Sequence, residues 1–215
     1  MKFVFFGDSI CFGQRVSPHL IWVSRISQDL ERISEGKVVV ANNSVNGNTT
    51  RNALERVGPD LQSENPIVVY IQFGLNDCNF WQTDHGHARV SLEAYKWNLV
   101  EIINRARFAG AQKVLLGTNH LTQFNGPMEK KISSKAPMPY REHIRIYNNA
   151  VRVVAEMTDV TLVDIEAEWI EGPERKGLGE AYLDPDGLHL SPLGHDFYYH
   201  IVGPACRKAV STLLA

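Results

Sequence analysis

The sequence has few cysteines and no apolar run of membrane-spanning length. Its 215 residues include three cysteines, Cys11, Cys78 and Cys206, and none of them forms a C-x-x-C pair. An odd number of widely spaced cysteines argues against a disulfide framework or a zinc site and fits a reducing cytoplasm. The apolar run at residues 3–6 is too short for the hydrophobic region of a signal peptide. We therefore expect a soluble, cytoplasmic protein without a membrane partner.

An excess of charge of one sign is also missing. The chain carries 22 Lys and Arg against 24 Asp and Glu, a formal net charge of -2, and no basic cluster. This balance gives no electrostatic reason to expect nucleic acid or anionic lipid as a partner. A hydrophobic content of 44% supplies a real core, and the length suits one domain over residues 1–215. The sequence gives no indication of oligomeric state.

Apolar runs alternate with amphipathic stretches along the whole chain. The runs predict buried strands at residues 3–6, 37–41, 67–73, 114–117 and 160–163. Residues recurring every three or four positions predict helices at 18–33, from 51 to 57 or 62, from 91 to a stop at 110, at 141–157 and from 193 to the end. Five such alternations predict one three-layer α/β/α domain with a parallel sheet.

Two segments have no regular period. Residues 165–183 are expected to be irregular, and residues 121–139 form a connection rich in proline, lysine and serine. A structureless connection of that length in a compact domain is typically a lid or a recognition loop.

Polar residues follow each of the first three predicted strands. Ser9 lies in the turn Gly7-Asp8-Ser9-Ile10, Gly47 lies in a polar loop, and Asn76 precedes an aspartate. The carboxyl ends of parallel strands share one edge of the sheet, where such folds bind ligands. Near the C-terminus, Asp186 and His189 form a D-x-x-H turn. A serine nucleophile needs a base and a group that orients this base, and such a turn supplies both.

A serine nucleophile also needs donors for the developing oxyanion. The N–H groups of Ser9 and Gly47 and the side-chain amide of Asn76 are suitable donors. Together the four blocks, Gly7-Asp8-Ser9-Ile10, the glycine of Val45-Asn46-Gly47, Gly74-Leu75-Asn76-Asp77 and Asp186-Gly187-Leu188-His189, resemble those of the SGNH, or GDSL, hydrolase family. They occur in the family's order and bracket nearly the whole chain.

The resemblance implies a flavodoxin-like sheet in the order 2-1-3-4-5 and hydrolysis of carboxylic esters. It implies Ser9 as nucleophile, His189 as general base and then acid, and Asp186 as the residue that orients His189. It implies an oxyanion hole made of Ser9, Gly47 and Asn76. No cofactor and no metal follow from it, so EDTA should leave activity intact.

Other interpretations stay open at this point. Asp184 competes with Asp186 for the acidic role, although the D-x-x-H spacing favours Asp186. His85-Gly86-His87 beside Asp84 is either a metal site or, more commonly, a solvated loop. Asn46 to Thr50 resembles a flavin phosphate loop, which suggests a binding module of the flavodoxin type, and a catalytically inactive relative is a further alternative.

The substrate is the least determined feature. Four residues near the expected site are candidates for substrate contact: Phe12, Phe80, Trp81 and His120. Polar loops and the absence of a long apolar groove favour a small-molecule ester with a short acyl group, such as acetyl, on a polar or carbohydrate alcohol. A lysophospholipase or a thioesterase of the same family is the alternative.

Overall fold

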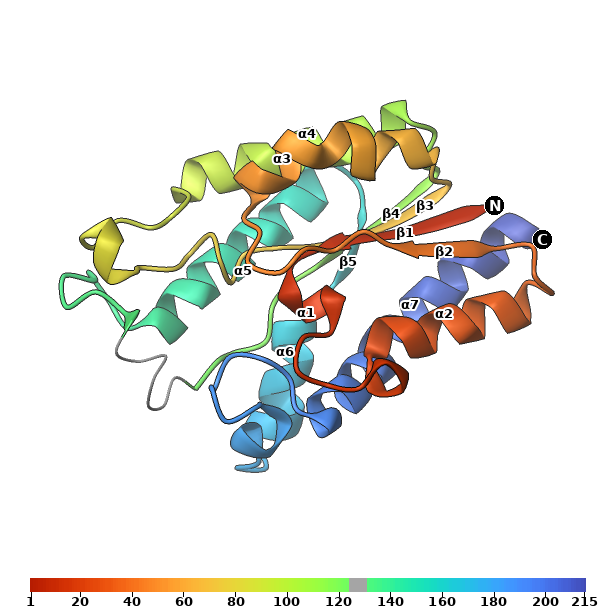
Figure 1. The fold of residues 1–215 in the computed structure, drawn as a ribbon. Coiled ribbons are helices and arrows are strands. Elements are labelled where there is room, and N and C mark those ends of the chain that lie inside the picture. The colour runs from red at the N-terminus through yellow and green to blue at the C-terminus, as the bar shows by residue number, and fades with distance from the viewer. Residues whose placement is uncertain (124–130) are drawn as a thin grey trace.

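Five parallel strands form one sheet in the computed structural model, which describes residues 1–123 and 131–215. The order of the strands is β2-β1-β3-β4-β5, and every pairing is parallel (Figure 1). This confirms the flavodoxin-like order 2-1-3-4-5 expected from the sequence. The strands are β1 (Lys2–Gly7), β2 (Val39–Asn42), β3 (Val68–Gln72), β4 (Lys113–Gly117) and β5 (Thr161–Val163).

Helices cover both faces of the sheet and complete the expected three-layer α/β/α arrangement. Helices α2 and α7 pack together on one face, and α3, α4 and α5 lie on the other (Figure 1). The short helix α1 lies at the end of β1, and α6 follows β5. The helices are α1 (Ser9–Phe12), α2 (Trp22–Ile33), α3 (Thr50–Asp60), α4 (Leu92–Phe108), α5 (Tyr140–Met157), α6 (Ile165–Trp169) and α7 (Pro192–Leu214).

The central strands form the core because both of their faces are covered. Phe3, Phe5 and Phe6 of β1 are completely buried, as are all five residues of β3. The prediction that the second strand is buried was wrong. Strand β2 lies at the edge of the sheet with only β1 beside it, and Val39 is 60% exposed.

Local structure departs from the expectation in two more places. The helix predicted over 18–33 begins only at Trp22, after a single turn of 3-10 helix at Pro18–Leu20. The stretch 165–183 contains α6 and further helical turns where irregular structure was expected. Residues 124–130 of the connection 121–139 lie outside the described residues, so the lid stays a prediction.

The carboxyl ends of the strands meet at one edge of the sheet, next to α1, and both chain termini lie at the opposite end (Figure 1). The loops after β1, β2 and β3 therefore lie close together, as the sequence analysis requires. Within residues 1–123 and 131–215, no helix combines the length and the apolarity that crossing a bilayer requires.

Candidate active site

Ser9 is held at the junction between β1 and α1. The strand ends at Gly7, Asp8 caps the helix, and Ser9 is the first helical residue, 7% exposed. A Cβ atom on Gly7 would lie 2.6 Å from Cys11 Sγ and 2.9 Å from the Gln72 carbonyl oxygen. Only glycine allows the helix to pack so tightly against the strands, and this packing fixes the backbone of α1 that carries Ser9.

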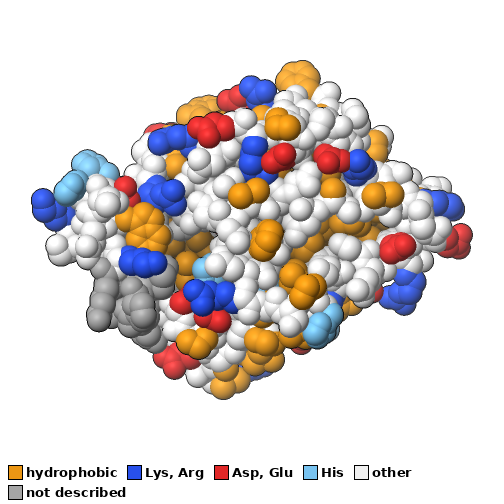
Figure 2. Space-filling model, in the orientation of Figure 1, with side chains coloured by type: hydrophobic (Ala, Val, Ile, Leu, Met, Phe, Trp, Pro, Cys, Tyr) orange, Lys and Arg blue, Asp and Glu red, His pale blue; other side chains and the backbone are white. Residues whose placement is uncertain are grey.

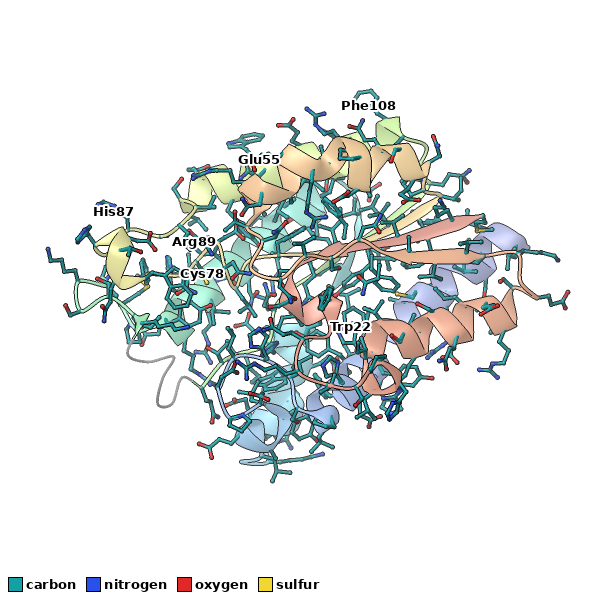
Figure 3. All side chains as sticks on the ribbon, in the orientation of Figure 1. Trp22, Glu55, Cys78, His87, Arg89 and Phe108 are labelled. Atoms are coloured by element: carbon teal, nitrogen blue, oxygen red, sulfur yellow. The ribbon has the colours of Figure 1, made fainter. Side chains whose placement is uncertain are left out.

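The opposite side of α1 is anchored by Trp22, at the start of α2 (Figure 3). Its indole Nε1 donates a hydrogen bond of 2.9 Å to the Ile10 carbonyl oxygen. Trp22 is completely buried and packs edge-on against Phe5 and Tyr70. The four-residue helix that carries Ser9 is thus held by the core, since a helix of one turn has little stability alone.

His189 reaches Ser9 from the far end of the chain. Its Nε2 lies 3.0 Å from Ser9 Oγ, and its Nδ1 lies 2.6 Å from Asp186 Oδ2. Since the carboxylate can only accept, Nδ1 carries the ring proton and Nε2 presents its lone pair to the serine hydroxyl. An imidazole in this tautomer can remove the hydroxyl proton, which is the geometry that nucleophilic attack by serine requires.

The D-x-x-H turn orients both of its polar side chains from within. Asp186 Oδ1 accepts hydrogen bonds of 2.9 Å from the N–H groups of Leu188 and His189. Burial acts to raise the pKa of Asp186, but the hydrogen bonds from the His189 ring and the two N–H groups outweigh it. The pKa is lowered to about 2. Asp186 is therefore ionised throughout the neutral range.

Asp184, the alternative acid, has a different environment. Its Oδ1 accepts from the Asp186 N–H at 3.3 Å, and the His189 ring bonds to Asp186 instead. Arg15 bridges the two acids, with its guanidinium 3.5 Å from Asp184 Oδ1 and 3.3 Å from Asp186 Oδ2. The geometry favours Asp186 as the partner of the imidazole.

Asn76 reaches the site from the turn after β3. Gly74 begins this turn with a φ of +137°, and a Cβ there would lie 2.7 Å from Asn119 Nδ2. Asn119 also donates to the Phe73 carbonyl oxygen at 2.9 Å. Asn76 Nδ2 lies 3.1 Å from the Asn48 carbonyl oxygen and 3.4 Å from Asp8 Oδ2. The side-chain amide is thus bonded to neighbours of both Ser9 and Gly47.

Gly47 lies in the loop after β2 with a φ of +75°, and a Cβ there would meet no atom within 4 Å. Arg56 holds this loop, because its Nε donates to Asn48 Oδ1 at 2.6 Å and its Nη2 to the Gly7 carbonyl oxygen at 3.1 Å. In residues 1–123 and 131–215, no protein acceptor bonds the N–H of Gly47 or Ser9. These two backbone donors are therefore available to an oxyanion.

The four candidate contact residues are divided between surface and interior. Phe12 is 47% exposed at the end of α1, and Trp81 is partly exposed beside a cavity of about 280 Å³ that Gln82, Thr83 and Lys131 also line. Phe80 is buried and stacks on the His143 ring at 4.3 Å between centroids. The structure therefore brings Phe12 and Trp81, but not Phe80, to the protein surface.

His120 is completely buried, which leaves no atom for a ligand. Its Nε2 lies 2.9 Å from the Leu188 carbonyl oxygen and its Nδ1 2.7 Å from Tyr198 Oη. Because the carbonyl only accepts, Nε2 carries the proton, and the ring supports the peptide that precedes His189. Its position after β4 pointed to the active edge, but α7 covers it with Tyr198.

Sequence reasoning missed the two supporting contacts made by Asp8 and Arg15. Asp8 directly precedes Ser9, so its closeness to the site was visible, but its bond to Asn76 depends on the tertiary fold. Arg15 lies in the loop after α1 and is distant in sequence from the acids that it contacts. No sequence signal marks that pair.

No metal centre forms within residues 1–123 and 131–215. Across these ranges no group of three His, Cys, Asp or Glu side chains is placed to bind an ion. His87 lies at the tip of a loop at the periphery of the molecule (Figure 3). His85 ends a turn of 3-10 helix in the left-handed conformation, with a φ of +53°. The solvated-loop interpretation of this motif fits these positions.

Comparisons with known proteins agree with the geometry. The model of the GDSL-like lipase/acylhydrolase family matches residues 5–197. An isoamyl acetate-hydrolyzing esterase 1 homolog of Mus musculus is 28% identical over 221 residues, covering 99% of this chain and 84% of the relative. An uncharacterized lipoprotein of Bacillus subtilis is 28% identical over 184 residues, covering 79% and 74%.

A solved structure extends the comparison to the fold. The acetylxylan esterase of Geobacillus stearothermophilus superimposes with a TM-score of 0.72 at 25% identity, covering 97% of this chain and 93% of that chain. The structural similarity therefore extends over nearly the whole of this chain.

Proposed function

The chain belongs to the GDSL-like lipase/acylhydrolase family and is a carboxylic ester hydrolase, and we propose that Ser9 is its nucleophile. One observation carries this proposal: Ser9 Oγ, the His189 imidazole and the Asp186 carboxylate form a hydrogen-bonded chain with links of 3.0 and 2.6 Å. A serine used only as a helix cap would need neither an imidazole nor an oriented acid.

In the first half of the reaction, Ser9 Oγ attacks the ester carbonyl carbon while His189 Nε2 takes the hydroxyl proton. The C=O electron pair moves onto the carbonyl oxygen, which the Ser9 and Gly47 N–H groups and Asn76 Nδ2 stabilise. The intermediate then collapses, the C–O bond to the alcohol breaks, and the alcohol leaves with the proton from His189. An acyl ester on Ser9 remains.

In the second half, His189 removes a proton from water, and the hydroxide attacks the acyl carbonyl. Collapse of this intermediate releases the carboxylic acid and returns the proton to Ser9 Oγ. Asp186 stays ionised and stabilises the imidazolium in both halves. Every catalytic group in these steps is a side chain or backbone N–H of the protein, so the proposed reaction uses no cofactor and no metal.

We propose further that the acyl group is short and that the alcohol is polar, as in an acetylated carbohydrate. The names of two compared proteins, which describe hydrolysis of isoamyl acetate and of acetylxylan, both support the acetyl group. Acetylxylan alone supports the carbohydrate alcohol, because isoamyl alcohol is apolar. On the face shown in Figure 2, acidic and basic side chains are interspersed with small hydrophobic areas, which suits a neutral polar substrate.

The cytoplasmic location stays a prediction, and the three cysteines are free thiols that agree with it.

Turnover by Ser9→Ala tests the nucleophile. We expect loss of p-nitrophenyl acetate hydrolysis with an unchanged circular dichroism spectrum, and retained turnover would refute the assignment.

A series of p-nitrophenyl esters from acetate to palmitate tests the acyl group. Highest kcat/KM at acetate or propionate supports the proposal, whereas a maximum above eight carbons, roughly where a larger apolar pocket is needed, favours the lysophospholipase or thioesterase alternative.

A further inference from the structure

Asp8 has an unusual position for an acid. It is completely buried, it directly precedes Ser9, and its Oδ1 caps α1 by accepting a 3.0 Å hydrogen bond from the Ile10 N–H. Burial is the main influence on its pKa, which is raised to about 7. The nearby Asp77 also raises the pKa, while the Ile10 N–H and His189 lower it. The protein thus retains a carboxyl group whose charged form is costly.

Capping of α1 does not explain this acid. Asparagine and aspartate are about equally good N-cap residues, and asparagine would avoid the burial of a charge. The two side chains differ at the second polar atom. Aspartate has another acceptor oxygen there, whereas asparagine has an NH2 group, which only donates.

The second oxygen of Asp8 faces the amide of Asn76. Asn76 Nδ2 lies 3.4 Å from Asp8 Oδ2 and 3.1 Å from the Asn48 carbonyl oxygen. When Asp8 is ionised, both of these neighbours only accept, so they require the nitrogen, and not the oxygen, of the amide at this place. The reversed amide would direct its oxygen at an oxyanion and repel it. The contact with Asp8 is the longer one, so the hydrogen directed at it can be shared with an oxyanion while Asp8 still faces the nitrogen.

We propose that Asp8 is a positioning residue of the oxyanion hole, which acts through Asn76 by holding the side-chain amide with its nitrogen toward the substrate carbonyl. The inference rests on the proposed function of Ser9, because it assumes an oxyanion at that position. It assigns to Asp8 a role in the chemical step and not in substrate binding.

A double-mutant cycle with p-nitrophenyl acetate tests this role. Asn76→Ala removes one oxyanion donor, which typically lowers kcat by roughly a hundred- to thousandfold. Asp8→Asn places an NH2 group against the amide of Asn76 and should lower kcat by about ten- to a hundredfold, the usual effect of a misplaced catalytic group. KM should change by less than about twofold, since ground-state binding is not affected.

The double variant distinguishes positioning from a general structural effect. If Asp8 acts through Asn76, the double variant is no slower than Asn76→Ala alone. If the two losses multiply, or if Asp8→Asn retains full kcat, the inference is wrong. Asp8→Ser is a second variant, which keeps a capping oxygen for Ile10 but offers no acceptor to Asn76. It should show the same loss and the same coupling, and a wild-type kcat in a folded Asp8→Ser variant would also overturn the inference.

A fluorophosphonate label separates this test from that of the nucleophile. If the wild-type protein is labelled at Ser9 and the cycle is multiplicative, only the role of Asp8 fails. If the label does not react at Ser9, the proposed nucleophile and the role of Asp8 both fail.

Discussion

Ser9 and His189 lie 180 residues apart in the chain, and their Oγ and Nε2 atoms lie 3.0 Å apart. The sheet produces this contact by ending β1 at the edge where the loop before α7 returns. Two supports hold the segments that carry these atoms. Trp22 bonds to the Ile10 carbonyl oxygen of α1, and His120 bonds to the Leu188 carbonyl oxygen, just before His189. The proposed chemistry depends on both supports because neither segment has regular structure of its own beyond one turn.

Replacement of the orienting acid should slow the chemical step. We expect Asp186→Asn to lower kcat by roughly a thousand- to ten-thousandfold, since an amide can stabilise the wrong tautomer of His189. Steady-state kinetics with p-nitrophenyl acetate measure the effect. Asp184→Asn is the matched control, and a comparable loss in that variant would move the acidic role to Asp184. Since the pKa of Asp186 is about 2, its titration should not appear in the pH–rate profile between pH 4 and 10.

Gly47 should tolerate a side chain sterically but not conformationally. A Cβ there meets no atom within 4 Å, yet the φ of +75° costs an alanine about 1–2 kcal/mol. We expect Gly47→Ala to turn the peptide and lower kcat by roughly tenfold or more, with KM little changed. Gly36→Ala is a control with the same open space and a φ of +77°. Gly36→Ala should keep the wild-type kcat. If Gly47→Ala keeps it as well, the Gly47 N–H does not serve the oxyanion.

Burial of Asp8 should make the protein less stable as the pH rises from the acidic range to neutrality. The folded-state pKa of about 7 lies above the usual 3.8, so the folded chain holds this proton more tightly than the unfolded chain. The contribution of Asp8 to the free energy of unfolding therefore falls as the pH rises from about 4 to 7. Asp8→Asn should raise the melting temperature more at pH 8.5 than at pH 4.5. The opposite trend would show that the buried carboxylate is stabilising.

The contribution of His120 to the free energy of unfolding should depend on pH in the opposite direction. Burial lowers its pKa from 6.5 to about 4, so the unfolded chain takes up this proton first as the pH falls. The stabilisation by neutral His120 is present above pH 6.5 and is lost as the pH falls to about 4. His120→Phe leaves the Leu188 carbonyl unbonded and should cost about 1–3 kcal/mol at pH 7.5.

Urea unfolding of the wild type and His120→Phe at pH 7.5 and 4.5 measures this difference, which should narrow at the lower pH. His200→Gln, at an exposed position of α7, is the control and should change little at either pH. A difference that stays constant with pH would contradict the neutral state of His120.

The sequence predicts the sheet and the position of the candidate residues well, for a physical reason. Buried parallel strands are continuous apolar runs, and the residues after them share one edge, so Ser9, Gly47 and Asn76 can be placed together without coordinates. Their exact alignment is beyond such reasoning. Whether the Asn76 amide faces the site with its nitrogen depends on Asp8 and Asn48, which approach it only in the folded chain.

The errors have a common origin in tertiary packing. β2 has the apolar pattern of a central strand, but it lies at the edge, where Val39 is exposed. His120 and Phe80 follow strands, as ligand-binding residues do, yet Tyr198 covers one and His143 stacks on the other. Local pattern does not reveal which helix will cover a loop residue.

Trapping of the acyl-enzyme tests the proposed mechanism most directly. The protein is mixed with p-nitrophenyl acetate, quenched in acid within the first turnover, digested and examined by mass spectrometry. We predict one acetyl group on the peptide that contains Ser9, and none in Ser9→Ala, whose turnover is lost. Acetylation at another residue, or turnover by Ser9→Ala at the wild-type rate, would contradict the assignment of Ser9 and His189 as the reacting pair.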